Sequence, residues 1–447
     1  MKILHYSLGL PPYRTGGLTK FSMDLMKQQI HDGHDVTLLW PGEMSFLGKK
    51  TRIKPYRKIE GIQSYEVKNP VPISYDEGIK NPDIFMEPGD INCYRKFISF
   101  ITPDVIHIHT LMGLHKSLLD AAKERKIRIV FTAHDFFPIC PKVTLFRNGQ
   151  VCDCINTYKN CQSCNETALS IWKIKLLQTP FYRKIKNTSI IKKVRKQHRS
   201  DYLSGKKCIN PKTHISEASR PYIELRGHYS SLLDYIDIIH YNSFNTRKIY
   251  EKYLGKRDSK VISITHSDIK DNRKKKVFND DFLKITYLGP ESEAKGFFFL
   301  KSSLDILWNE RKNFSLKIFF QTDEISPYME VHNSYIYPQL EEIFKNTDIL
   351  AAPSLWYETF GFTVLEAISH GVPVIITKNV GAKDIIPKGS GIILKNLTPS
   401  NLAIAIKGLA APQLSKMNAA IINKAHIMTI KEMSEQISEK CYTKLNV

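Results

Sequence analysis

The sequence predicts two Rossmann-like α/β domains that face each other across a cleft. The chain has 447 residues, whereas a single hydrophobic core stops growing at roughly 250–300 residues, so about two domains are expected. In both halves, short apolar runs of strand length alternate with runs of helical periodicity, as in parallel βαβ units. In both halves, glycine also stands between a strand and the following helix, at Gly16-Gly17 and at Gly361.

The first domain is expected to span residues 1–265. Its first unit is a strand at 2–7, a loop with Gly16 and Gly17, and a helix from about residue 18 to 31. A glycine pair in this position lets a ligand approach the backbone closely. Further strands are predicted at residues 36–39, 103–109, 127–132, 235–243 and 261–264, and a helix is predicted at 113–124.

The strand predicted at 127–132 brings a His-Asp pair, His134 and Asp135, to its carboxyl end. Ligands of open α/β sheets bind beyond the carboxyl ends of the strands. His134 is therefore a candidate for polar chemistry. A structural role is the alternative for a single histidine.

The second domain is expected to span residues 280–425, after a polar, lysine-rich linker at 268–280. Residues 384–394 are predicted to complete its sheet, and the chain has a helical pattern from residue 399 to the end. The other strands of this domain are predicted at residues 283–289, 316–320, 348–352 and 373–377. Helices are predicted from residue 297 onward and at 340–346.

Five cysteines lie within 25 residues of the first domain: Cys140, Cys152, Cys154, Cys161 and Cys164. Cys161-x₂-Cys164 has the spacing of a zinc knuckle. We predict a structural zinc site made by Cys140, Cys161, Cys164 and either Cys152 or Cys154, with Cys152 preferred. An iron–sulfur cluster and uncoordinated thiols are the alternatives. Eight cysteines in all are too few and too clustered for a disulfide scaffold at this length.

Residues 140–230 are predicted to be a Cys-rich and basic helical insertion. Thirteen Lys or Arg residues lie between Lys173 and Lys212, where Asp201 is the one acidic residue. Aromatic and aliphatic residues are interleaved with them, a pattern that fits helices lying on an anionic membrane face. A charged insertion packed on the domain is the alternative. The basic stretch 45–58, predicted as a loop, favours contact with an anionic acceptor or lipid headgroups, or is a solvated face.

The charge balance also indicates an anionic partner, because the formal net charge is +21. Nucleic acid is disfavoured, since no nucleic-acid-binding motif accompanies the basic residues. The apolar run at the start is too short for a signal peptide, and no run approaches the ~18 apolar residues of a membrane span. We therefore expect a cytoplasmic protein, held peripherally on the inner face of the cell membrane.

The most informative stretch runs from residue 353 to 377. It joins a buried strand to a helix and a second strand. Glu358 stands in the loop, and Glu366 lies about one turn into the helix. Two carboxylates beside a helix start that favours anions suit a ligand with both hydroxyls and phosphates, such as a nucleotide sugar. The amides expected to face the anion belong to Gly361, Phe362 and Thr363.

The motif Glu358-x₇-Glu366, with E-x-F-G-F inside it and G-V-P-V-I after it, resembles the signature of the retaining family-4 glycosyltransferases of GT-B fold. The resemblance covers both domains and is least typical over residues 140–230. It implies that the second domain holds the nucleotide-sugar donor and that the last helix, here within 426–447, returns to the first domain. The implied reaction is glycosyl transfer with retention at the anomeric carbon.

The resemblance also assigns roles within the motif. Glu366 corresponds to the carboxylate that binds the ribose hydroxyls of the nucleotide. Glu358 corresponds to the carboxylate that approaches the donor sugar, and we predict it as catalytic. The resemblance implies that the sugar and diphosphate are cradled by the amides of Gly361, Phe362 and Thr363.

Outside the motif, the resemblance carries over to three further places. Gly16 and Gly17 match a loop that lies against the donor diphosphate and the acceptor. His134 matches a histidine that contacts the donor sugar near the reacting carbon, so we predict it as catalytic. Lys295 matches a lysine that binds the donor phosphates. The family's arginine position holds Pro290, so one cationic phosphate ligand of the family is missing here.

The prediction is a retaining glycosyltransferase that acts on a glycan or lipid-linked acceptor in bacterial surface polysaccharide synthesis, such as lipopolysaccharide or capsule. The resemblance implies that catalysis needs no cofactor. The alternatives are a GT-B-fold sugar-nucleotide epimerase or phosphorylase, and a degenerate GT-B-fold binding protein at the membrane. The spacing of the two carboxylates disfavours the epimerase, and the chain is short for a phosphorylase. Pro290 is the feature that favours the binding protein.

Overall fold

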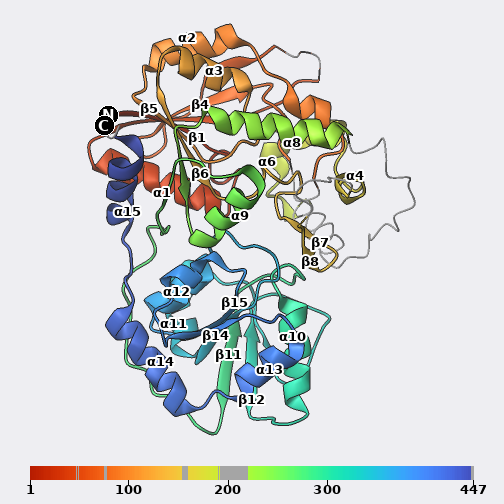
Figure 1. Cartoon of the computed structure of the whole chain (residues 1–447), viewed down its shortest axis with the longest axis vertical. Helices are drawn as coiled ribbons and strands as arrows, with labels where there is room; N and C mark the ends of the chain where they lie inside the picture. Colours follow the sequence, from red (N-terminus) through yellow and green to blue (C-terminus); the bar gives the residue numbers. More distant parts are fainter. Residues whose placement is uncertain are drawn as a thin grey trace.

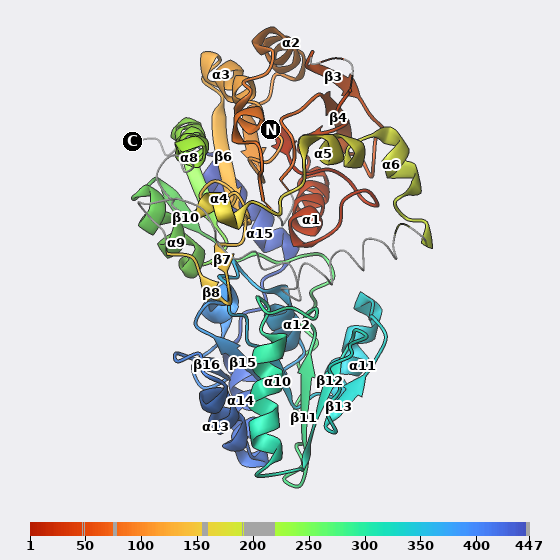
Figure 2. The same cartoon turned by 90° about the vertical axis from the view of Figure 1, so that its right-hand side faces the viewer.

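The computed structural model has two α/β lobes stacked along the long axis of the molecule (Figures 1 and 2). It describes residues 1–46, 48, 50–74, 78–153, 160–189, 191 and 220–443. The first lobe contains an eight-stranded sheet and the second a six-stranded sheet. Each sheet packs between hydrophobic clusters. The two Rossmann-like domains of the prediction are therefore present.

The sheet of the first lobe has the strand order β10-β9-β6-β5-β1-β2-β4-β3. All neighbours are parallel except β3, which pairs antiparallel with β4 at the edge. The order changes direction at β1, and ligands of open α/β sheets bind beyond the strand ends at such a point. The strands are β1 Lys2–Tyr6, β2 Asp35–Pro41, β3 Arg52–Pro55, β4 Gln63–Lys68, β5 Val105–Ile108, β6 Arg128–Ala133, β9 Ile238–Tyr241 and β10 Ser259–Val261.

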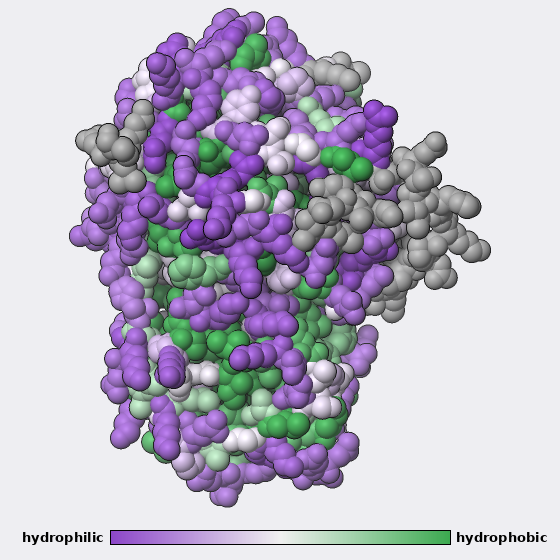
Figure 3. Space-filling view, in the orientation of Figure 1, coloured by the Kyte–Doolittle hydropathy of each residue, from purple (hydrophilic) through white to green (hydrophobic). Residues whose placement is uncertain are grey.

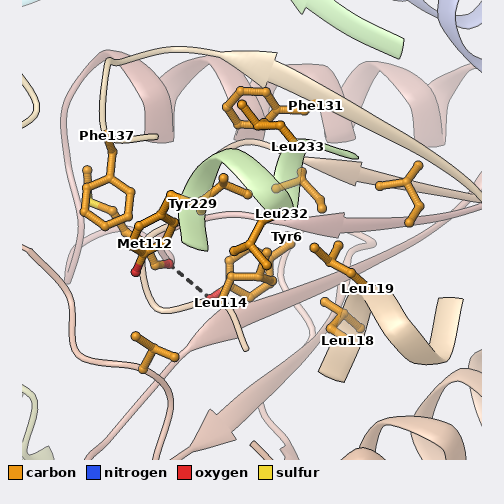
Figure 4. Packing of buried hydrophobic residues seen from close by; sticks show 14 of the residues in the cluster. Tyr6, Met112, Leu114, Leu118, Leu119, Phe131, Phe137, Tyr229, Leu232 and Leu233 are labelled. Atoms are coloured by element: carbon orange, nitrogen blue, oxygen red, sulfur yellow. Dashed lines mark hydrogen bonds between the residues drawn. The ribbon is translucent and has the colours of Figure 1, made fainter. Parts of the chain in front are cut away.

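The two faces of this sheet follow from the alternation of side chains along its strands. Leu4 and Tyr6 of β1 point into the large cluster shown in Figure 4, where the Tyr6 hydroxyl donates a hydrogen bond to the Met112 carbonyl at 3.2 Å. Ile3 points to the opposite face, toward α1. The helices around this sheet are α1 Gly17–His31, α2 Ile91–Ile101, α3 Lys116–Glu124, α8 Arg220–Leu232 and α9 Phe244–Leu254.

The sheet of the second lobe is entirely parallel, with the order β13-β12-β11-β14-β15-β16. Its strands are β11 Leu283–Tyr287, β12 Phe314–Ile318, β13 Met329–Val331, β14 Ile349–Ala352, β15 Val374–Thr377 and β16 Gly391–Leu394. Its helices are α10 Phe297–Trp308, α11 Leu340–Lys345, α12 Phe362–Ser369, α13 Pro399–Lys407 and α14 Ala411–Lys424.

The end of the chain returns to the first lobe, where α15 (Ile430–Ile437) lies beside α1 (Figure 1). A capping box between Thr429 and Glu432 starts this helix. A short π-helical turn, η5 Ser438–Tyr442, follows and places Tyr442 under the first sheet, 3% exposed. The C-terminal segment thus completes the core of the N-terminal lobe.

Before α8, the described part of the predicted insertion, residues 140–153, 160–189 and 191, consists of short elements on one side of the first lobe. A hairpin, β7 Phe146–Arg147 with β8 Gln150–Val151, lies at the junction of the two lobes in both views (Figures 1 and 2). A Cβ built on Gly149 in its turn would lie 2.8 Å from Glu293 Oε1 of the second lobe. The short helices of the insertion are α4 Cys161–Cys164, α5 Ile171–Leu177 and α6 Pro180–Ile185.

Several element predictions differ from the structure; the strand predicted at 261–264, for example, is β10 at Ser259–Val261. The stretch 45–58, predicted as a loop, contributes β3, which the Ile53–Val67 and Lys54–Glu66 pairings hold at the sheet edge. Residues 384–394, predicted to complete the second sheet, do so through β16 alone, because residues from Gly381 to Ile385 form a 3₁₀ turn. In the latter two cases tertiary pairing decides the conformation, and local composition does not reveal it.

Within the described part of the chain, no helix has the length and apolar character needed to cross a membrane. On the face seen in Figure 3, hydrophilic residues cover most of both lobes, and hydrophobic residues gather around and below the lobe junction. The junction is therefore less polar than the outer surface on this face.

Candidate active site

The loop after β14 and the start of α12 form the centre of the candidate site. Gly361, which precedes α12, has a φ of 108°, a value that favours glycine. A Cβ at this position would lie 3.2 Å from a side-chain carbon of Val380. Gly361 has no side chain with which to cap α12. The backbone amides of Phe362 and Thr363, together with the helix dipole, therefore favour an anion at this end.

The first lobe contacts this helix start directly. A Cβ on Gly17 would lie 3.4 Å from the ring of Phe362, so the glycine loop at Gly16-Gly17 packs against α12. The Thr359 carbonyl accepts hydrogen bonds from the hydroxyls of Ser243 and Thr246, at 2.7 and 2.9 Å. These contacts hold the motif loop between the strand ends of both sheets.

Lys295 and Glu358 form an ion pair in the second lobe, with 2.5 Å between Nζ and Oε1. The other carboxylate oxygen of Glu358 accepts from the Ser354 hydroxyl at 2.8 Å. Burial alone would raise the pKa of the Glu358 carboxyl, but the charge and hydrogen bond of Lys295 outweigh burial and hold that pKa below its usual range. Glu358 is therefore an anion at neutral pH.

The backbone around Lys295 needs a glycine at the next position. Gly296 has a φ of 80°, and a Cβ there would lie 2.0 Å from the carbonyl oxygen of Pro353. This close packing joins the Lys295 turn to the motif loop and brings the ammonium group over the Trp356 ring, at 4.8 Å. Pro290, at the family's arginine position, offers its carbonyl to the Tyr287 hydroxyl at 2.8 Å.

Glu366 is a buried carboxylate, 3% exposed, and its Oε2 atom has no hydrogen-bond partner among the described residues. His266 Nε2 lies 3.7 Å from the other oxygen, and neither ring nitrogen of His266 is hydrogen-bonded. Buried polar atoms in native proteins nearly always have partners. Such unsatisfied groups side by side therefore indicate a ligand that donates and accepts hydrogen bonds, as a ribose diol does.

Two tyrosines line the same place. Burial, and secondarily the negative charge of Glu366, raise the pKa of the Tyr335 and Tyr337 hydroxyls. Tyr337 also packs edge-on against the His266 ring, with 5.2 Å between centroids. Sequence reasoning did not select His266, Tyr335 or Tyr337, since they lie outside the motif in the linker and before α11.

His134 lies directly after β6, in the first lobe, and its carbonyl accepts from the Thr359 hydroxyl at 3.0 Å. Its ring packs 4.6 Å from Phe21 and its Nε2 lies 3.3 Å from His109 Nδ1. Burial lowers the pKa of the His134 imidazole to about 3, so the ring is neutral. Burial likewise raises the pKa of Asp135 to about 6.

The structure thus gathers most of the predicted site residues at one junction. Its first-lobe part consists of His134, Gly16 and Gly17. Its second-lobe part consists of Lys295, Glu358, Gly361, Phe362, Thr363 and Glu366. A substrate placed there would meet a cation, an uncapped helix start and two carboxylates. Such a set is chemically suited to stabilising a phosphate-bearing leaving group and binding hydroxyls.

The cysteines form a separate group in the insertion. Burial raises the pKa of the Cys161 thiol to about 12, Arg226 opposes this, and neighbouring Cys140, Cys164 and Cys152 add to it. Among the described residues, however, one group has potential metal-ligand atoms that all lie within 4.8 Å of one another, and it consists of His5, His107 and His109. The cysteines that the structure describes do not form such a group. Cys154, the other fourth-ligand candidate, falls outside the described residues.

Most of the predicted membrane-binding residues, including Lys192, Lys193, Arg195 and Lys196, also lie outside the described residues. Within the described part, Arg183 is engaged by the protein itself: it pairs with Glu66 at 2.7 Å and lies 4.7 Å from the Trp40 ring. Trp172 and Phe181 are exposed, at 61% and 66%. The described insertion thus combines intramolecular ion pairs with exposed aromatic side chains.

Two family models match the chain, one in each lobe. Residues 15–158 match Glycosyltransferase Family 4, and residues 268–428 match Glycosyl transferases group 1. An uncharacterized 42.6 kDa protein in the cps region of Klebsiella pneumoniae is 22% identical over 384 residues, which is 83% of each chain. A D-inositol 3-phosphate glycosyltransferase of Paenarthrobacter aurescens is 30% identical over 22% of this chain and 24% of its own.

Solved structures share the fold over almost the whole chain. Sucrose-phosphate synthase from Thermosynechococcus elongatus has a TM-score of 0.57 at 11% identity, covering 98% of this chain and 97% of its own. The Anabaena protein HepE, in complex with UDP and glucose, has a TM-score of 0.55 at 13% identity, covering 98% of both chains. These likenesses show the GT-B fold, and the two family matches identify the chain as a glycosyltransferase.

Proposed function

We propose that this glycosyltransferase moves a sugar from a nucleotide-sugar donor to a glycan or lipid-linked acceptor, with retention at the anomeric carbon. The observation that carries the proposal is the unsatisfied, buried Oε2 of Glu366 beside His266. A ribose diol would give Glu366 its missing hydrogen bonds, and the diphosphate would then extend toward the start of α12.

The charge that develops on the leaving diphosphate needs stabilisation. Lys295 and the uncapped amides of α12 would supply it, from the two sides of the motif loop. In the structure Lys295 pairs with Glu358, which accepts hydrogen bonds and would orient the hydroxyls of the donor sugar. The family has an arginine and a lysine at two positions that contact the donor phosphates. The arginine position holds Pro290 here, so Lys295 is the one cation that these two positions supply.

Neither predicted catalytic residue suits the role of a general base at neutral pH. The pKa of His134 is about 3, and the pKa of Glu358 is held below its usual range. We therefore assign the acceptor's proton to an oxygen of the departing donor phosphate. The new bond then forms on the face that the leaving group vacates, and the anomeric configuration is retained.

A screen of nucleotide sugars tests this function. HepE binds UDP-glucose according to its structure, so UDP-sugars are the first donors to try. The expected result is thermal stabilisation by one donor, slow release of its nucleotide, and a sugar product with the α or β configuration of the donor by NMR. An inverted product would contradict retention. Binding without any turnover would favour the degenerate binding protein, and a new nucleotide sugar would favour the epimerase.

For the acceptor, we propose a growing surface polysaccharide or its lipid-linked precursor. The relative in a cps region supports this class of pathway.

We also propose peripheral binding to an anionic membrane, supported by the exposed Trp172 and Phe181 of α5 and α6. Vesicle sedimentation tests it: binding should need anionic lipid and weaken with salt. Reversing Lys192, Lys193, Arg195 and Lys196 to Glu should abolish binding and leave donor hydrolysis intact, and continued sedimentation would refute it.

We further propose that Cys140, Cys152, Cys161 and Cys164 hold a structural zinc ion. The other three thiols lie near enough to Cys161 to raise its pKa, and a thiolate set suits zinc. Among the described residues these sulfur atoms do not all lie within 4.8 Å of one another, so binding zinc would require them to draw together. Protein purified reduced and without chelator should carry about one zinc per chain. Cys161→Ser should lose the metal and destabilise the first lobe. Metal-free protein of unchanged stability would refute the site.

A further inference from the structure

One face of the first sheet carries a layer of buried polar side chains. His5 of β1, His107 of β5, Thr132 of β6 and His240 of β9 all lie on the face toward α1, and each is 0% exposed. Register places His5 beside His107 and Thr132 beside His240. The other face of these strands is apolar. Four adjacent strands therefore share a polar layer on one face.

These residues form a continuous series of hydrogen bonds that begins at His134 in the candidate site. His134 Nε2 lies 3.3 Å from His109 Nδ1, and His109 Nε2 lies 2.9 Å from His5 Nδ1. His5 Nε2 then lies 2.7 Å from Gln29 Oε1. Gln29 Nε2 donates to the Tyr442 hydroxyl at 2.9 Å. The series thus runs from the lobe junction to the C-terminal segment.

From Tyr442 the series continues across the sheet. The Tyr442 hydroxyl lies 2.7 Å from His107 Nδ1, and His107 Nε2 lies 2.6 Å from Thr132 Oγ1. Thr132 Oγ1 is 2.9 Å from His240 Nδ1, and His240 Nε2 is 2.8 Å from the carbonyl oxygen of Ile262. A backbone carbonyl only accepts hydrogen bonds, so this last contact has one possible direction.

The direction of every other hydrogen bond follows from that end. Burial lowers the pKa of all these imidazoles, so each is neutral, with one donor and one acceptor nitrogen. His240 donates to Ile262 and must accept from Thr132. Thr132 has one proton and must therefore accept from His107. His107 in turn accepts from Tyr442.

The same rule continues to the active site. Tyr442 gives its single proton to His107, so it accepts from Gln29. The Gln29 amide then has its oxygen toward His5, and turning it around would leave two acceptors facing each other. His5 donates to Gln29 and accepts from His109, and His109 accepts from His134.

We infer that this series of hydrogen bonds fixes His134 in the tautomer with the proton on Nε2, which leaves Nδ1 as a hydrogen-bond acceptor for the substrate. Resting on the proposed function, this selects the chemistry beside His134. A sugar hydroxyl or amide N–H fits there, because both donate, whereas a carboxylate or phosphate would face a lone pair. Tyr442, Gln29 and the layer act as positioning residues through His109. The histidine triad uses all its ring nitrogens in this series, so a metal would have to displace several hydrogen bonds.

The test is NMR of the full-length protein, without donor, carrying ¹⁵N-labelled histidine, at pH 7. A His134→Gln variant assigns the signal. The expected result is a neutral His134 ring with its proton almost entirely on Nε2. A proton on Nδ1, or a charged imidazolium, would overturn the inference. Because no donor is present, failure of the proposed function would not affect this readout.

A second measurement tests the role of the C-terminal segment. Tyr442→Phe removes the hydroxyl through which the carbonyl of Ile262 sets the direction of the hydrogen bonds nearer the active site. His5, His109 and His134 would then populate both tautomers. The affinity for the matched donor should fall by up to about twofold. Tyr229→Phe, which removes a buried hydroxyl bonded to the Phe85 carbonyl, is the matched control and should leave the His134 signal unchanged. An unaltered His134 tautomer in folded Tyr442→Phe would refute the relay. If that variant does not fold, the wild-type spectrum still decides the tautomer.

Discussion

The two sheets are both mainly parallel, yet they bury different side chains. In the first lobe, the side chains of His5, His107 and His240 are buried on one face of the sheet. His5 hydrogen-bonds with His109, and His107 and His240 both hydrogen-bond with Thr132. In the second lobe the corresponding strands are filled mainly by aliphatic residues, and Thr286 with Thr347 is a small polar exception. The second lobe places Lys295 and Glu358 in loops beyond the strands and Glu366 on α12.

The difference teaches how the two lobes divide the work. Under the proposed function, Lys295 and Glu358 in the loops and Glu366 on α12 would meet the charge and hydroxyls of a donor. The buried layer of the first lobe has no access to a substrate except through His134, and its effect is to orient that ring. Buried polar groups are tolerated there because each has a partner.

The largest expected effect is the response to acid. The buried imidazoles of His5, His107, His109 and His240 have lowered pKa values, about 4 for His5 and His240. The unfolded chain binds protons near pH 6.5 and the folded lobe does not, so stability is full above 6.5 and falls as pH drops toward 4. Each ring contributes about 1.4 kcal/mol per pH unit in this window, which for four rings is about 5.6 kcal/mol per pH unit.

Hydrogen exchange at pH 7 and pH 5 measures this effect. Strands β1, β5 and β9 should lose protection at pH 5 before β14 and β15 do. If the second lobe opened first, or both opened together, the buried layer would not be the acid-sensitive part of the molecule.

Lys295→Met should have the next largest effect. It removes the cation opposite Glu358 and the predicted phosphate ligand, so kcat/KM should fall at least about hundredfold, about 2.7 kcal/mol. Steady-state kinetics with the matched donor measure it. Lys301→Met is the control, since Lys301 pairs with Asp305 on α10, and it should keep nearly full activity. Equal losses in the two variants would remove Lys295 from the site.

A matched pair of threonines compares the sheets themselves. Thr132→Val breaks two hydrogen bonds of the first sheet, to His107 and His240, and leaves buried nitrogens unsatisfied. Thr286→Val removes one bond, to Thr347, whose own hydroxyl still reaches the Ile343 carbonyl. We expect losses of about 2 and about 1 kcal/mol in the free energy of unfolding. Denaturant titration measures both, and an equal or reversed order would contradict the proposed importance of the layer.

The last effect concerns the ribose. Glu366→Gln keeps the shape but weakens charge-assisted hydrogen bonds to the diol, so donor affinity should fall at least about tenfold, about 1.4 kcal/mol. Calorimetry with the nucleotide measures it. Glu341→Gln, on α11 and largely exposed, is the control. Unchanged binding in Glu366→Gln would place the ribose elsewhere.

The sequence by itself determined the two-domain α/β architecture and the core of the candidate site. Gly361 before a helical period, with Glu358 and Glu366 at its two sides, is a local arrangement, so the backbone places these groups whatever packs around them. The same holds for Lys295-Gly296, where a positive φ demands glycine. Local constraints of this kind can be recognised from a single sequence.

Only the tertiary structure decided which distant residues complete the site. The histidines of β1, β5 and β9 alternate with apolar residues, a pattern equally typical of half-exposed strands, so burial was not predictable. His266 and Tyr337 reach Glu366, and Tyr442 reaches His107, through contacts between segments far apart in the chain. Such contacts depend on how helices and lobes pack, and the direction of a hydrogen-bond series depends on the single carbonyl at its end.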